Sequence, residues 1–272
     1  RELYLVGDSG DYPILTINNN QGWNSVVNMS NSGNSLLKNF TITGGKGEWC
    51  GNCNMPDGDN YSGGGVFINR DDWNDSEVAV RLENLVIQGN EAIYGSGVFA
   101  REGSVRIKNC IIKENSAYEE GNQRGMGGGV LLMHQASSNS FDSEIINTSI
   151  NNNFAHDGGA VVLWQNNWGN NSILFDNTII HGNNANYHGG VALMDGNAVF
   201  MNATIVQNAT EWSEEQGSGL DLSSDSIARV INSIFHNNSH NNLNLQGDSL
   251  FIDYSIVPQG QDSIAVNESA FL

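Results

Sequence analysis

The sequence predicts an all-β fold, a right-handed parallel β-helix of about eight or nine coils, and two repeating patterns predict it. In the first, a short glycine run opens onto an aliphatic residue at intervals of about thirty residues. Repeats of about 20 to 50 residues are typical of solenoids, in which each repeat buries its apolar face against its neighbours. The aliphatic residues that follow the runs are Val66, Val98, Val130, Val161, Val191 and Leu220.

The second pattern is an asparagine before a short apolar run, with another asparagine six residues later. The runs are rich in Val and Ile, and the chain has only 3 prolines, which favours strands over helices. Because asparagine tolerates left-handed backbone and hydrogen-bonds locally, we expect both sets to form turns and side-chain ladders. The pairs are Asn84 and Asn90, Asn109 and Asn115, Asn147 and Asn153, Asn177 and Asn183, Asn202 and Asn208, and Asn232 and Asn238.

Two of these coils carry motifs of a known kind of repeat. Gly158-Gly159-Ala160-Val161 has the form GGA[I/V/L], and the segment from Phe235 to Asn238 has the form FxxN. In this the chain resembles right-handed parallel β-helix proteins of bacterial surfaces, of the polymorphic outer-membrane protein repeat type. The resemblance covers about residues 26–272 and implies the architecture and an extracellular or cell-surface location. It implies no particular activity, because one fold hosts many functions.

Composition limits the partners. A solenoid grows by repetition, so we expect one domain over residues 1–272, with irregular leading coils in 1–29 and repeat coils in 30–272. The abrupt start and end predict a mature or trimmed part of something larger. No apolar run is long enough to span a membrane. The net charge of −19 disfavours nucleic acid, anionic lipid and polyuronate as partners and suits a secreted protein.

Cys50 and Cys53 form a C-x-x-C motif in an expected loop. A redox motif would accompany a βαβ pattern and a zinc site would need a second pair of ligands, and neither is evident. We therefore expect a loop-closing disulfide, with two free thiols as the alternative. Acidic loops also offer oxygen ligands that suit calcium. The candidate calcium ligands are Asp57, Asp59, Asp71 and Asp72.

The strand after each glycine run is apolar on both of its faces. Side chains alternate along a strand, so Val66 and Ile68 and their equivalents are expected to point inward. The outward positions are also apolar, which marks either an interaction surface or a face that loops cover. Long loops with aromatic residues flank this face. The residues expected to contact a ligand there are Phe67, Phe99, Arg101, Met133, Trp164, Trp168 and Met194.

These features predict a secreted or cell-surface module, without catalysis, that binds carbohydrate or another surface component in an adhesin or extracellular coat. One alternative is a polysaccharide lyase or glycoside hydrolase that works in the loop-flanked groove. A second is a structural subunit that self-associates end to end into extracellular filaments through unpaired strand edges. The candidate reacting groups for the enzyme are Arg101, His134, Asp157 and His188.

Overall fold

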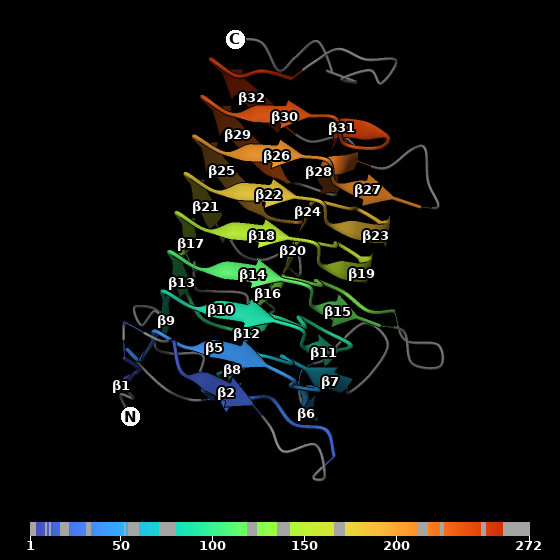
Figure 1. Cartoon of the computed structure of the whole chain (residues 1–272). Helices are drawn as coiled ribbons and strands as arrows, with labels where there is room; N and C mark the ends of the chain where they lie inside the picture. Colours follow the sequence, from blue (N-terminus) through green and yellow to red (C-terminus); the bar gives the residue numbers. More distant parts are fainter. Residues whose placement is uncertain are drawn as a thin grey trace.

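The computed structural model confirms a right-handed parallel β-helix (Figure 1). It describes residues 4–8, 10, 12–16, 22–30, 34–51, 53, 60–70, 80–118, 124–134, 142–165, 172–211, 217–223, 226–245 and 249–257. Within these ranges the regular secondary structure is all strand, and none of it is an apolar helix of membrane-spanning length. The chain makes eight coils, and strand β32 (Ser249–Asp253) begins a ninth.

Five coils have a strand in each of four parallel sheets, in the order A, B, D and C. Sheet A contains β1 (Tyr4–Val6), β4 (Leu36–Lys38), β9 (Val80–Glu83), β13 (Val105–Lys108), β17 (Asp142–Ile146), β21 (Ser172–Asp176), β25 (Asn197–Met201), β29 (Ile227–Ile231) and β32 (Ser249–Asp253). Sheet B contains β2 (Ile14–Thr16), β5 (Thr41–Thr43), β10 (Val86–Gln88), β14 (Ile111–Lys113), β18 (Ser149–Asn151), β22 (Ile179–His181), β26 (Thr204–Val206) and β30 (Ile234–His236).

The other two sheets complete each coil. Sheet D contains β11 (Glu91–Ala92), β15 (Ser116–Ala117), β19 (Phe154–Asp157), β23 (Asn184–Tyr187) and β27 (Ala209–Thr210). Sheet C contains β3 (Val27–Asn28), β8 (Val66–Asn69), β12 (Val98–Arg101), β16 (Val130–His134), β20 (Val161–Gln165), β24 (Val191–Met194), β28 (Gly217–Ser223) and β31 (Asn241–Leu245). A separate antiparallel pair joins β6 (Glu48–Cys50) to β7 (Asn60–Ser62).

The register of sheet C confirms the repeat frame. Val98 pairs with Val66 on one side and with Val130 on the other, and the same column continues to Val161 and Val191. The inward residues of sheet C from Val66 to Leu222 belong to one continuous apolar core and expose at most 1% of their surface. Like residues therefore stack directly above one another through the solenoid.

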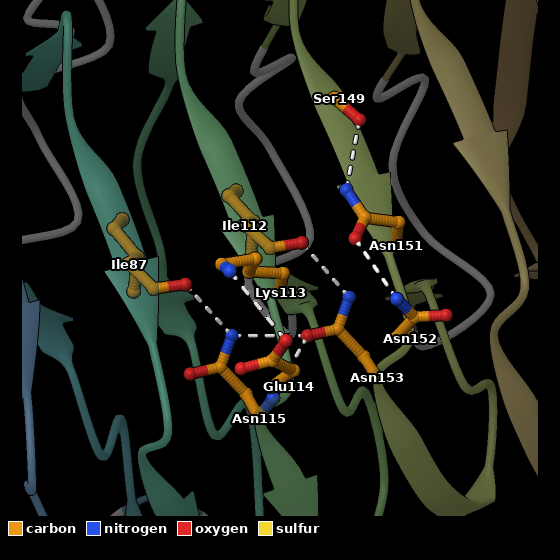
Figure 2. Close-up of polar contacts among 9 residues, drawn as sticks. All are labelled: Ile87, Ile112, Lys113, Glu114, Asn115, Ser149, Asn151, Asn152 and Asn153. Atoms are coloured by element: carbon orange, nitrogen blue, oxygen red, sulfur yellow. Dashed lines mark hydrogen bonds and ion pairs between the residues drawn. The ribbon is translucent and has the colours of Figure 1, made fainter.

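The second asparagine of each pair forms a buried ladder at the corner between sheets B and D (Figure 2). The Asn115 side-chain amide donates to the carbonyl of Ile87 at 3.0 Å and to Asn153 Oδ1 at 2.9 Å. Asn153 Oδ1 also accepts the backbone N–H of Asn115 at 3.1 Å, while its own amide donates to Ile112 and Asn183. Every donor and acceptor of the Asn153 amide is thus satisfied, as a buried asparagine requires. The ladder includes Asn90, Asn115, Asn153, Asn183, Asn208 and Asn238.

The first asparagine of each pair turns the chain from sheet A to sheet B. Asn84, Asn109 and Asn147 have φ values of 52°, 54° and 49°, in the left-handed region that asparagine tolerates. Their side chains also hydrogen-bond from coil to coil, but in contact with water. The expected turns and ladders are therefore both present, in two different surroundings.

Candidate functional site

The outer face of sheet C is covered by apolar side chains over its first coils. The outward column begins with Phe67 and Phe99, which expose 3% and 0% of their surface and stack at 5.5 Å. They belong to a second apolar cluster, separate from the core, together with the fully buried Met133. These three expected ligand contacts therefore pack under a cover in this structure and do not line an open groove.

The cover comes from the edge of sheet D and from the antiparallel pair β6–β7. Cys50 and Cys53 form a disulfide with a Cα–Cα distance of 5.5 Å, and both cysteines lie in the cluster that contains Phe67 and Phe99. Tyr94 and Met126 complete it from two successive coils. The disulfide thus holds a short loop as part of the cover.

The candidate reacting groups lie on different coils. Arg101, on β12, is 3% exposed and donates to Asn69 Oδ1 at 3.1 Å. His134 ends β16, and burial lowers its pKa to about 3, so that its imidazole is neutral near pH 7. Neither side chain belongs to the pair of Asp157 and His188, which the fold brings into contact on later coils.

The structure does not describe the predicted calcium ligands or one of the predicted ligand contacts. Asp57, Asp59, Asp71, Asp72 and Trp168 lie outside the described residues. In the ranges that the structure does describe, no group of three or more His, Cys, Asp or Glu side chains is arranged to hold a metal ion.

His188 occupies a position where the preceding coils have glycine. Gly158 has a φ of 65°, and a Cβ there would collide with Val162, the outward residue of the same coil. One coil further, the outward residue is the smaller Ala192, and the turn residue is His188 with a φ of 56°. A non-glycine residue in this region costs about 1 kcal/mol. Where one coil has Gly158 and Val162, the next coil therefore has a strained His188 and the smaller Ala192.

The imidazole of His188 lies between carboxylates from the two neighbouring coils. Its Nδ1 is 3.4 Å from Asp157 Oδ1, and its Nε2 is 3.6 Å from Asp221 Oδ1. His156 Nδ1 contacts the other oxygen of Asp157 at 3.0 Å. Asp221 Oδ2 accepts from the backbone N–H of Gly217 at 2.9 Å and from Asn244 at 2.7 Å. We call Asp157, His188 and Asp221, with His156 and Asn244, the charged chain.

Each of the four carboxylate oxygens in the charged chain therefore already has a partner in the protein. In this arrangement the carboxylates hold His188 between two neighbouring coils, and the geometry suits stabilisation of the stacked coils.

Burial and charge act against each other on the two central groups. Burial alone would raise the pKa of Asp157, but the contacts with His188 and His156 outweigh it and hold the pKa below 3.8. Burial alone would lower the pKa of His188, but the contacts with Asp157 and Asp221 outweigh it and hold the pKa above 6.5. Each shift therefore favours the charged form of its group, the Asp157 carboxylate and the His188 imidazolium.

We expect the charged chain to stabilise the coils from β17 to β28 most strongly between about pH 4 and 6.5. The contribution is lost as the pH falls through the lowered pKa of Asp157 or rises through the raised pKa of His188. Each unit by which the His188 pKa is raised corresponds to about 1.4 kcal/mol. Denaturant unfolding measured from pH 4 to 9 checks this.

The double variant His188→Gly, Ala192→Val is the matched control because it rebuilds the turn of the preceding coil. Its free energy of unfolding should vary less above pH 6.5 than that of the wild type. A difference between the two proteins that stays constant from pH 5 to 9 would contradict the role of His188.

Two larger side chains lie on the outer face of sheet C, which also carries Asp221. Trp164 and Met194 pair in register on β20 and β24, are half-buried, and pack against the cluster that contains Ala192. Of the expected ligand contacts in the described ranges, these two keep partial exposure. Asp221 and Asn244 were missed from sequence, although Asp221 continues the outward column by one coil.

The coils and this face define the class of the protein as a right-handed parallel β-helix with a charged chain on one outer sheet. No protein-family model, no curated protein and no solved structure matches the chain.

Proposed function

We propose that this chain is a rigid, non-catalytic module of a secreted or cell-surface bacterial protein, and that it binds carbohydrate or another surface component. One observation carries the proposal: half-buried Trp164 and Met194 share the outer face of sheet C with Asp221 of the charged chain. A partly exposed apolar surface beside fixed polar groups is typical of binding sites. An adhesin or an extracellular coat would use such a module.

The disulfide, the net charge and the repeat motifs support an extracellular location. The Cys50–Cys53 disulfide is of a kind that persists in oxidising compartments. The net charge of −19 suits a protein that stays soluble outside the cell. The GGA[I/V/L] and FxxN motifs support a relationship with repeats of the polymorphic outer-membrane protein type.

The test is glycan binding by a Trp164→Ala variant. We expect at least about a tenfold loss of affinity for any glycan that the wild type binds on an array, because truncation of a central aromatic anchor commonly costs this much. Phe154→Ala is the control, since Phe154 is 38% exposed on the neighbouring sheet D. Unchanged binding by Trp164→Ala would contradict this site.

The same samples test the absence of catalysis. Incubation with the bound glycan should yield neither new reducing ends nor unsaturated products. Product formation that is lost in an Asp157→Asn variant would overturn the non-catalytic assignment, because it would show that this carboxylate reacts despite its partners.

A further inference from the structure

Four aromatic rings from separate segments meet beside the apolar cluster that contains Phe67 and Phe99. The Trp23 indole stacks with Tyr61 at 4.6 Å and with Tyr118 at 5.8 Å between ring centroids. Trp49 packs edge-on against Tyr61 at 5.3 Å and is itself 55% exposed. We call these four rings the aromatic platform. Trp23, Tyr61 and Tyr118 are half-buried, so the platform has both a packed side and an open side.

Neighbouring residues hold the rings of the platform in place. Trp49 and Tyr61 are direct partners in the antiparallel pair β6–β7, which puts their side chains on one face of that pair. Tyr61 and Tyr118 pack against the cluster that contains the Cys50–Cys53 disulfide and Ile93. Rings that are already held in place lose little conformational freedom when a ligand binds. The exposed aromatic surface is therefore preorganised.

Among the described residues, one ion pair is tied to the segment that carries Trp23. The backbone N–H of Lys46 donates to the carbonyl of Asn24, next to Trp23, at 2.9 Å. The Lys46 ammonium pairs with Glu91 at 2.7 Å, and both side chains are about half exposed. A ligand at the rings would thus meet a donor and an acceptor at one edge. The net charge of −19 on the whole chain also disfavours an anionic ligand.

We propose that the aromatic platform is a binding surface for a neutral polysaccharide chain. A pyranose ring presents an apolar face of C–H groups, which the negative face of an aromatic ring attracts, and its hydroxyls lie around the edge. The stacked rings supply the first contact, and Lys46 and Glu91 supply hydrogen bonds at the edge. The surface is separate from Trp164 and does not depend on it.

The experiment is affinity electrophoresis of the whole chain in gels that contain mixed-linkage β-glucan, xylan, mannan or polygalacturonate. The wild type is expected to be retarded by a neutral polysaccharide and not by polygalacturonate. Trp49→Ala should weaken that binding about tenfold or more. Because Trp49 is 55% exposed, this variant should keep the circular dichroism spectrum of the wild type. Tyr254→Ala, at a side chain 90% exposed near the other end, is the control and should bind as the wild type.

Running Trp164→Ala in the same gels shows whether a contrary result contradicts the platform proposal or the proposed function. If Trp49→Ala binds the neutral polysaccharides as the wild type does, the platform is not a binding surface. If only Trp164→Ala weakens binding, the platform proposal fails and the proposed function stands. Retardation by polygalacturonate alone also overturns the neutral ligand. If the wild type binds none of the four, the platform proposal fails, and the glycan array decides the proposed function.

Discussion

Replacing Phe200 with alanine is expected to lower the free energy of unfolding by about 3–5 kcal/mol, as is usual for large-to-small changes in a packed core. Phe200 is fully buried on β25. Its ring stacks parallel to Phe175 at 4.6 Å and meets Phe235 edge-on at 5.7 Å. Truncation would leave a cavity between three coils and remove both ring contacts. Denaturant unfolding monitored by circular dichroism measures the loss.

A control variant and a hydrogen-exchange measurement make this prediction specific. Phe251→Ala, on the outer face of the same sheet, removes a side chain that is 45% exposed and should change stability by less than about 1 kcal/mol. In a solenoid each repeat contacts only its neighbours. Hydrogen exchange in Phe200→Ala should therefore quicken first in β21, β25 and β29. Uniform acceleration along the whole chain would show that the coils do not act as a row of neighbours.

Replacing Asn153 with alanine is expected to cost about 3–5 kcal/mol, although it removes only a small side chain. The Asn153 amide makes four hydrogen bonds in the buried ladder, to Ile112, to Asn183 and twice to Asn115. Its loss leaves two donors of Asn115 and one carbonyl without these partners, and each unsatisfied buried group costs about 1–3 kcal/mol. The same unfolding measurement applies, with hydrogen exchange of the Asn115 amide as a local readout.

The matched control lies in the same coil. Asn147 belongs to the water-exposed ladder and has a φ of 49°, which glycine adopts freely. Asn147→Gly should therefore cost about 1 kcal/mol or less, since water can replace its partners. Equal losses for Asn153→Ala and Asn147→Gly would show that burial does not make the inner ladder more important than the outer one.

The fold could be predicted because its determinants are periodic. An interval of about thirty residues places Val98 above Val66, and alternation along the strand then assigns Val98 to the core and Phe99 to the outer face. The same frame predicted the asparagine ladders. It did not show that one ladder is buried and the other exposed, because burial depends on which sheets meet at each corner.

The candidate site was predicted only in part. Asp157 and His188 stood out because His188 breaks a column of glycines, but Asp221 looked like an ordinary polar residue until register placed it against the imidazole. The aromatic platform was harder to predict from the sequence. Trp23 and Tyr118 are 95 positions apart in the chain (118 − 23), and they meet only because of the path that the loops take.

By itself, the sequence determined the stacking of coils, the inward and outward faces of sheet C and the turn asparagines, because each follows from a spacing that repeats along the chain. Only the tertiary structure decided that Phe67 and Phe99 are covered, that a charged chain links four coils and that four rings meet. Those contacts are made by single side chains and loops that do not repeat, so no period in the sequence encodes them.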